Sequence, residues 1–98
     1  MKVTFDPAAS DELDRVFEWI AKDNSRAAHE LIARIEAKVS QLATPELTYM
    51  GRPGLIEGTR ELLEWPYIIV YKVYEDLTEI VIVSVVHGAQ DREKELPA

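Results

Sequence analysis

The sequence predicts an α+β fold in which an antiparallel helical hairpin packs on one face of a three-stranded antiparallel meander. Apolar residues recur at helical spacing before residue 43. After residue 58 the pattern changes to three runs rich in β-branched and aromatic residues, at 58–65, 67–74 and 79–87. The last two runs are apolar at both alternating positions, so neither strand can have a fully solvated face. We therefore expect the helices to cover the sheet.

A short strand and a first helix are expected at the N-terminus. Val3 and Phe5 alternate as in a strand, Asp6 is typical of a helix N-cap, and Pro7 suits the first helical position. The apolar stripe of this helix consists of Leu13, Val16, Phe17 and Ile20. Trp19 lies away from the centre of the stripe, so we expect it at the margin of the core.

A second helix is expected between Asp23-Asn24-Ser25, which can cap it, and Pro45, which follows its end. Its apolar stripe consists of Ala28, Leu31, Ile32, Ile35, Val39 and Leu42. Because the link between the two helices is short, they are expected to pack as an antiparallel hairpin. His29 lies beside the stripe and is expected at the surface.

The composition limits the class of protein. We expect a single domain over residues 1–98, because this length supports one hydrophobic core. The chain has no cysteine, which excludes disulfides and thiolate metal sites, and nothing in it indicates a cofactor or another metal site. It has neither an apolar run long enough to span a membrane nor the apolar segment of a signal peptide at its start. A cytoplasmic location is therefore expected.

The charge of the chain disfavours direct binding of nucleic acid. The formal net charge is -7, and residues 57–79 carry six acids but only the two bases Arg60 and Lys72. Proteins that bind nucleic acids gain affinity when Lys and Arg release counterions from phosphates. This region would repel phosphate, so the charge favours a protein partner.

Residues 45–57 form the main predicted loop. Gly51-Arg52-Pro53-Gly54 is typical of turns, and it lacks the strand–glycine–helix context of a phosphate-binding loop. The loop also carries the apolar side chains of Tyr49, Met50, Leu55 and Ile56, which we expect to pack against the core.

The order of these elements resembles the RelE/ParE superfamily of toxins from bacterial toxin–antitoxin pairs. The resemblance also rests on Gly58-Thr59-Arg60-Glu61-Leu62, on the tyrosine-rich run 67–74, and on Val86-His87-Gly88-Ala89-Gln90-Asp91. It covers nearly the whole chain. It implies a compact toxin that is neutralised by a small antitoxin, whose helix and extended segment wrap the toxin. The other end of the antitoxin binds operator DNA.

The RelE branch of this superfamily cleaves mRNA on the ribosome. Cleavage through the 2′-hydroxyl requires proton transfer and cations that stabilise charge on phosphorus, and the candidates here are Arg60 and His87. The arginine and tyrosine that this branch has after its last strand are not matched, because the chain reads His87-Gly88-Ala89-Gln90. In place of its earlier lysines, the second helix and the loop offer only Arg34, Lys38 and Arg52. The catalytic set is incomplete.

The ParE branch resembles gyrase poisons, which bind DNA gyrase without doing covalent chemistry themselves. The acidic charge fits this branch better. We therefore expect a ParE-like toxin that inhibits DNA gyrase and is neutralised by a ParD-like antitoxin. The alternatives are a ribosome-dependent endoribonuclease of the RelE type and an inactive member that only binds its antitoxin.

Contact residues follow from the gyrase hypothesis. The target contact is expected to involve Arg60, Gln90, Asp91 and Arg92. The last two strands have more apolar positions than one helical hairpin can cover, so the antitoxin is expected at Trp65, Tyr71, Val73 and Val83. Under this hypothesis Arg60 and His87 are structural: Arg60 pairs with Glu64, Glu79 or Asp91, and His87 caps the last strand.

Overall fold

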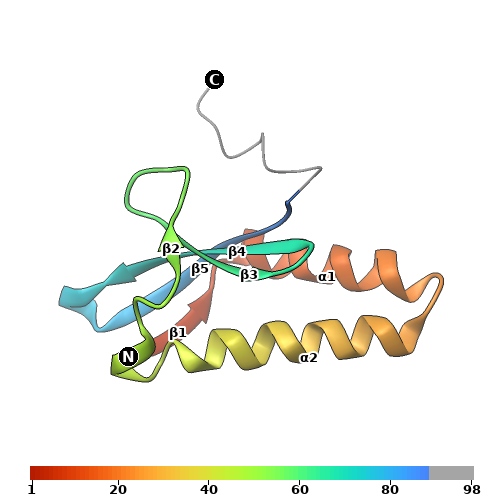
Figure 1. The fold of residues 1–98 in the computed structure, drawn as a ribbon, viewed down its shortest axis with the longest axis horizontal. Helices are drawn as coiled ribbons and strands as arrows, with labels where there is room; N and C mark the ends of the chain where they lie inside the picture. Colours follow the sequence, from red (N-terminus) through yellow and green to blue (C-terminus); the bar gives the residue numbers. More distant parts are fainter. Residues whose placement is uncertain (89–98) are drawn as a thin grey trace.

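The computed structural model describes residues 1–88 and confirms the α+β prediction (Figure 1). In chain order the helices and strands are β1 (Lys2–Phe5), α1 (Pro7–Ala21), α2 (Ser25–Gln41), β2 (Arg52–Pro53), β3 (Arg60–Glu64), β4 (Tyr67–Tyr74) and β5 (Glu79–His87). Short 3-10 helices at Pro45–Leu47 and Glu75–Leu77 complete the connections.

The sheet has five strands in the order β1-β5-β4-β3-β2. Its centre is the predicted antiparallel meander of β3, β4 and β5. On one side β1 pairs in parallel with the first half of β5, from Lys2 opposite Glu79 to Phe5 opposite Ile82. On the other side the two-residue strand β2 pairs with β3. The two outer strands therefore extend the meander beyond its predicted width.

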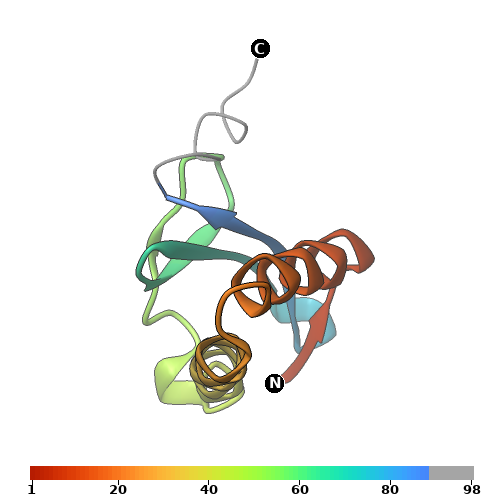
Figure 2. The ribbon, with the colours of Figure 1, turned by 90° about the vertical axis from the view of Figure 1, so that its right-hand side faces the viewer.

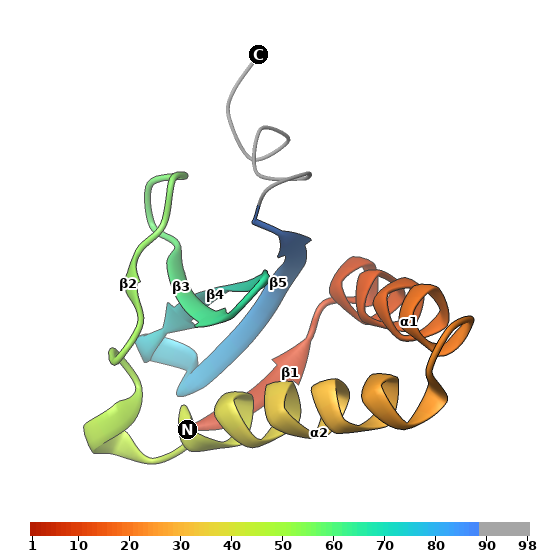
Figure 3. The ribbon, with the colours of Figure 1, turned by 45° about the vertical axis from the view of Figure 1, so that its right-hand side comes forward.

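Both helices lie on the same side of the sheet, as predicted (Figures 2 and 3). They begin at the predicted caps. The Asp6 carboxylate accepts a hydrogen bond from the Ala8 amide at 2.9 Å, and the Asn24 side chain accepts one from the Ala27 amide at 3.0 Å. Such caps satisfy amide groups that have no partner within the helix.

The main core fills the space between the helices and the sheet. Its buried members include Ala9, Leu31, Ile35, Val39, Leu42, Leu62, Ile69, Tyr71, Ile80, Ile82 and Val85. The predicted stripe of α2 supplies most of the helical part of this core, while Leu13, Val16 and Ile20 of α1 pack against it half-buried. Burial of these apolar side chains away from water is the main stabilising contribution to such a fold.

A β-bulge in β5 determines which of its side chains enter that core. Val70 lies opposite Ser84, but the next residue, Tyr71, lies opposite Ile82, so Val83 is the extra residue. An inserted residue reverses the alternation of side chains along a strand. Val85 therefore packs in the main core with Ile82, whereas Val86 joins Ile68 and Val70 in a small cluster on the other face.

The predicted packing of the 45–57 loop against the core is wrong. Tyr49, Met50, Leu55 and Ile56 are all exposed. The loop closes on itself because the Gly54 amide donates to the Thr59 carbonyl at 2.8 Å and the Thr59 hydroxyl donates to the Ile56 carbonyl at 2.6 Å. This closed turn projects away from the sheet between β2 and β3 (Figure 1).

Within residues 1–88, neither helix is long and apolar enough to cross a membrane.

Candidate protein-binding site

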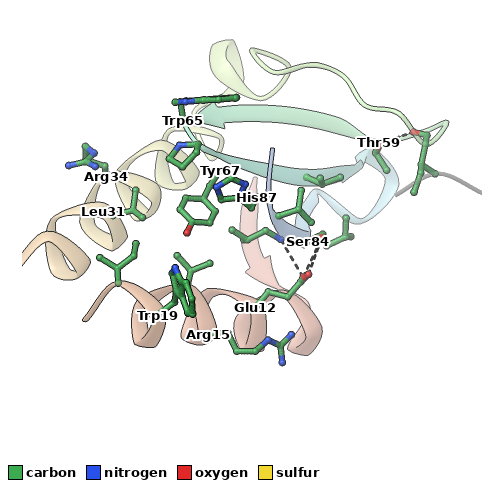
Figure 4. Close-up of a pocket in the computed structure, with 18 of the residues that line it drawn as sticks. Glu12, Arg15, Trp19, Leu31, Arg34, Thr59, Trp65, Tyr67, Ser84 and His87 are labelled. Atoms are coloured by element: carbon green, nitrogen blue, oxygen red, sulfur yellow. Dashed lines mark hydrogen bonds between the residues drawn. The ribbon is translucent and has the colours of Figure 1, made fainter. Parts of the chain in front are cut away.

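A groove of about 990 Å³ lies between α1 and the outer edge of β5 (Figure 4). It forms because β1 stops at Phe5, opposite Ile82, whereas β5 continues to His87. Among the described residues, no strand pairs with this edge of β5 beyond Ile82. We call this feature the α1–β5 groove. Its lining includes Glu12, Arg15, Val16, Trp19, Leu31, Arg34, Trp65, Tyr67, Lys72, Val83, Ser84 and His87.

The side chain of Glu12 covers part of the open strand edge. The Ser84 hydroxyl lies within hydrogen-bond distance of both Glu12 carboxylate oxygens, at 3.1 and 3.3 Å, and the Val85 amide donates to one of them at 3.3 Å. An unpaired strand edge is a site at which another strand can add, and natural proteins often block such edges with charged side chains. Glu12 therefore blocks this edge and ties α1 to the end of β5.

Two tryptophans stand on opposite sides of the groove, Trp19 from α1 and Trp65 from the turn between β3 and β4 (Figure 4). They are 69% and 70% exposed, and they are the only tryptophans in the chain. Between them the rings of Tyr67 and His87 pack edge to face, with their centroids 5.3 Å apart. Large apolar side chains that remain exposed in this way are typical of protein interfaces.

The groove is positively charged, in contrast to the chain as a whole. Its charged lining residues are Arg15, Arg34 and Lys72 against the single acid Glu12. The whole chain has 18 acids and 11 bases. The Glu12 carboxylate is already hydrogen-bonded to β5, and Arg34 has one partner, Glu64, at 3.5 Å. The groove is thus a local exception to the acidic surface.

The side chain of Arg60 binds the backbone of the loop that precedes β2. Its Nη2 donates to the carbonyl oxygens of Gly51 and of Tyr49, the latter at 2.9 Å, and the guanidinium lies 5.5 Å from the centroid of the Tyr49 ring. These contacts replace the predicted ion pair with Glu64 or Glu79. Glu64 instead pairs with Arg34 and Lys38 of α2, and Glu79 accepts a hydrogen bond from Thr4.

Tyr71 fastens the same loop to the sheet from inside the core. Its hydroxyl donates to the Thr48 carbonyl at 2.9 Å and accepts from the Gly51 amide at 3.1 Å. A side chain at position 51 would meet this hydroxyl at 2.8 Å and the Glu61 carbonyl at 2.5 Å, so the close approach requires glycine. Arg52 then pairs with the buried Glu61 at 3.0 Å.

At the far side of this loop, the Tyr49 hydroxyl donates a hydrogen bond to the Glu75 carboxylate. This hydrogen bond is the main cause that raises the pKa of Tyr49 above its ordinary value of 10.0. The reason is that loss of the phenol proton would remove the bond and place two negative charges side by side.

A comparison with known protein families identifies the chain. Residues 3–92 match the family model described as the ParE toxin of the type II toxin–antitoxin system parDE. The chain belongs to the ParE toxin family. The predicted resemblance to the RelE/ParE superfamily is thereby confirmed.

Individual relatives of this ParE-family protein agree. The protein named "Putative toxin Y4kP" from Sinorhizobium fredii is 41% identical over 80 residues, which cover 80% of this chain and 78% of the relative. The solved structure of a chromosomal ParDE toxin–antitoxin system from P. aeruginosa has a TM-score of 0.75 at 22% identity, covering 89% of this chain and 95% of that one. The toxin–antitoxin complex RelBE2 from Mycobacterium tuberculosis has a TM-score of 0.51 at 26% identity, covering 88% of each chain.

Arg60 and His87, the two nuclease candidates, lie far apart in this ParE-family fold. Arg60 is opposite Tyr71 of β4 and His87 is opposite Tyr67, so they are separated by four positions along the sheet and by two strands across it. With about 3.3 Å per residue and about 4.8 Å per strand, their Cα atoms are roughly 16 Å apart. The Arg60 guanidinium is also directed toward the loop beside β2, away from β5.

The other predicted contact residues of the ParE-family protein have different positions. Trp65 and Val83 line the α1–β5 groove, and Val73 is half-buried against the core. Tyr71 is 0% exposed, so its side chain cannot contact a partner in this conformation, and we correct the expectation that it binds the antitoxin. Gln90, Asp91 and Arg92 lie outside the described residues.

Residues 1–88 contain no group of three His, Asp or Glu side chains that could hold a metal ion.

Sequence reasoning missed the side of α1 that faces the groove. Glu12, Arg15, Val16 and Trp19 line the groove and are spaced i, i+3, i+4 and i+7, which places them on one side of a helix. The core stripe of α1 shares Val16 with this set, so the two stripes overlap. The helical spacing of the four groove residues is visible in the sequence. They were missed because only Val16 belongs to the predicted apolar stripe.

Proposed function

We propose that this ParE-family toxin inhibits DNA gyrase by protein–protein binding and is neutralised by a ParD-like antitoxin. Family membership and the fold shared with a ParDE system support the proposal. Inhibition by binding requires no covalent chemistry and no cofactor. Operator DNA is contacted through the antitoxin only.

The position of Arg60 is the observation that carries the choice of gyrase over RNA. A guanidinium that stabilises charge on phosphorus must present its N–H groups to the substrate. In this protein Nη2 of Arg60 donates to two loop carbonyls, and Nε is buried without a hydrogen-bond partner. Arg60 therefore holds the loop in place, and roughly 16 Å separate its Cα from that of His87.

The surface charge supports the same choice. RNA binding depends on the release of counterions by Lys and Arg, and this chain has a formal net charge of -7. Binding to a protein target does not require Lys and Arg that release counterions from phosphates.

The antitoxin, in this proposal, covers the α1–β5 groove. Trp65 and Val83 line it, and their burial would remove exposed apolar area from water. Val73 lies beyond the groove, in a smaller hollow of about 330 Å³ beside Tyr49 and Arg60, where the antitoxin would extend. The antitoxin contacts proposed for this chain are therefore Trp65, Val73 and Val83.

The gyrase contact is proposed for the C-terminal residues Gln90, Asp91 and Arg92, with Arg60 contributing through the shape of its loop. Charge reversal of Arg92 is expected to reduce toxicity, whereas Arg60→Lys is expected to act only through folding. The matched surface control is Arg26→Glu, because Arg26 is an exposed residue of α2 whose partner is the exposed Glu30.

The deciding experiment incubates purified toxin with gyrase, ATP and supercoiled plasmid, and in parallel with a reconstituted translation reaction. We expect cleaved plasmid to accumulate after protein denaturation, while the mRNA remains intact. Arg92→Glu is expected to lower the yield of cleaved DNA, and Arg26→Glu is expected to leave it unchanged.

Other outcomes select the alternatives. Codon-specific mRNA cuts without any effect on gyrase would refute the proposal and support a RelE-type nuclease. If the folded toxin binds its antitoxin but acts on neither target, the chain is an inactive member of the family.

A further inference from the structure

We infer that the segment of residues 47–56 contacts gyrase directly, by placing the exposed side chains of Tyr49, Met50 and Leu55 on an apolar surface of gyrase that has Lys or Arg at its margin. The inference rests on the proposed inhibition of gyrase. It adds a surface within the described residues to the C-terminal contact proposed above, and it specifies the chemistry of the gyrase surface that the 47–56 segment binds.

Exposed apolar side chains are concentrated in the 47–56 segment. Of the ten large apolar side chains that are exposed in residues 1–88, five belong to it: Leu47, Tyr49, Met50, Leu55 and Ile56. Single exposed apolar residues are common on protein surfaces, but a concentration of them is typical of a site that binds another protein. Because the core covers none of the five, we attribute their presence to a partner.

Polar contacts from the protein interior hold the backbone of residues 48–51 in place. The buried Thr48 hydroxyl donates to the backbone carbonyl that caps α2, at 2.9 Å. The buried Tyr71 hydroxyl joins the Thr48 carbonyl to the Gly51 amide. Tyr49 and Met50 lie between these two anchored positions and are 47% and 39% exposed. The fixed backbone therefore holds two apolar side chains in water.

The closed turn between β2 and β3 exposes Leu55 in a similar way (Figure 1). Its ends are joined by the hydrogen bond from the Gly54 amide to the Thr59 carbonyl, and the buried Thr59 side chain is bonded to the Ile56 carbonyl. Leu55 and Ile56 are each 44% exposed. A surface that is ordered before binding avoids the entropic cost of immobilising a loop at the interface. The segment is thus suited to bind a partner without rearrangement.

The charges beside the segment favour a basic partner. The acids that flank it are all exposed: Glu46, Glu57, Glu75 and Asp76. The single base within residues 45–59 is Arg52, which pairs with the buried Glu61 at 3.0 Å. An enzyme that acts on DNA holds the phosphates with Lys and Arg, so the proposed target has basic surfaces that complement these acids. The lining of the α1–β5 groove is mostly basic, so the two surfaces suit partners of opposite charge.

Met50→Ser and Leu55→Ser test the apolar contact. Neither residue lines the α1–β5 groove or the smaller hollow beside Tyr49, so these variants leave the surface proposed for the antitoxin intact. Each is expected to weaken binding to purified gyrase about tenfold and to lower the yield of cleaved plasmid. The matched control is Leu63→Ser, which removes the same side chain from β3 at a similar exposure of 39% and should leave both measurements unchanged.

Glu57→Lys tests the choice of a basic partner. We expect it to slow association with gyrase at low ionic strength and to have a smaller effect at high ionic strength, because salt screens charges at the margin of an interface. The control is Glu36→Lys, which makes the same change of charge at an exposed residue of α2. Circular dichroism establishes that each variant is folded before its binding is compared.

Two results would place the gyrase contact elsewhere or change its chemistry. If the wild-type toxin binds gyrase and Met50→Ser and Leu55→Ser bind it as tightly as Leu63→Ser does, the 47–56 segment is not the contact, and inhibition of gyrase still stands. If Glu57→Lys and Glu36→Lys associate with gyrase equally fast, the target is not selected by charge.

Three further results would assign the segment to another occupant or remove its target. If Met50→Ser and Leu55→Ser weaken binding of the small protein encoded by the adjoining reading frame, and not of gyrase, the antitoxin covers the segment. If the toxin sediments as a dimer that Leu55→Ser dissociates, a second copy covers it. Failure of the wild-type toxin to bind gyrase at all refutes the proposed function, and the inference with it.

Discussion

At the scale of single residues, Arg60 lies where β3 meets the loop that precedes β2, and its guanidinium donates to two carbonyls of that loop. The sequence placed Arg60 among acids and so predicted an ion pair. The carbonyls of Tyr49 and Gly51 come close to it only because Tyr71 fixes the loop from the core. Contacts of this kind depend on the path of the backbone, which the identity of nearby residues does not reveal.

We predict that Arg60→Ala lowers the free energy of unfolding by about 1–3 kcal/mol, because two loop carbonyls, of which that of Gly51 is half-buried, lose a charged donor. Arg60→Lys is expected to restore only part of this loss, since an ammonium lacks the planar fork of donors. Urea unfolding followed by circular dichroism measures the change. Arg26→Ala, at an exposed pair, should change stability by less than about 0.5 kcal/mol. An unaltered midpoint for Arg60→Ala would contradict the structural role.

Tyr49 carries a prediction about pH. Its pKa is raised above 10.0 in the folded protein, chiefly by the hydrogen bond to Glu75. A raised pKa means that the folded state holds the proton more tightly than the unfolded state does. The stabilising contribution of this bond is therefore fully present below pH 10 and is lost as the pH rises through the raised pKa.

The titration of Tyr49 can be followed by the absorbance of its phenolate, as the difference between the wild-type protein and Tyr49→Phe. Glu75→Gln is expected to lower the pKa of Tyr49 toward its ordinary value, because the acceptor loses its charge. If Glu75→Gln leaves the difference titration where it was, Glu75 is not the cause of the shift.

At the scale of helices and strands, the sequence predicted what depends on local periodicity. Both helices begin at their predicted caps, and the last three strands form the predicted meander. The position of β1 was not predicted, because its partner β5 is distant in sequence and no local signal specifies parallel pairing. β2 has only two residues, which is too short for alternation to be visible.

The candidate site depends on that unpredicted pairing. The α1–β5 groove exists only because β1 is shorter than β5, so a sequence that specifies both strands still does not specify the open edge between Val83 and His87. The sequence predicted Trp19 at the margin of the core and Trp65 at the antitoxin contact, but their positions on opposite sides of one groove follow from the sheet order and the direction of α1 (Figure 4).

The open edge of β5 leads to a prediction for Glu12. Glu12→Ala leaves the Val85 amide without its acceptor and removes the charge that blocks the edge. We expect this variant to associate with itself through strand pairing, and sedimentation velocity over a range of concentrations would detect the new species. Asp11→Ala removes the same charge at an exposed position and should remain as monomeric as the wild-type protein. Identical sedimentation of the two variants would show that Glu12 does not protect the edge.

At the scale of the whole molecule, the protein combines a formal net charge of -7 with a groove whose charged lining residues are mostly basic. We predict that the toxin alone binds a fluorescently labelled single-stranded RNA more weakly than about 10⁻⁴ M at physiological salt, the weak end of non-specific binding. Fluorescence anisotropy measures this affinity. Micromolar binding that weakens steeply with added salt would contradict the electrostatic argument against nucleic acid.

The pairing of β1 with β5 also has a consequence for how the toxin is made. The ribosome synthesises β1 first, but its neighbour in the sheet appears only when residues 79–82 have been added. β5 also lies between β1 and the rest of the sheet. A chain interrupted before residue 79 therefore cannot bring β1 into the sheet. Pairing between such distant segments is slow compared with the formation of a helix. An interrupted message therefore yields a chain without β5, in which β1 has no partner strand.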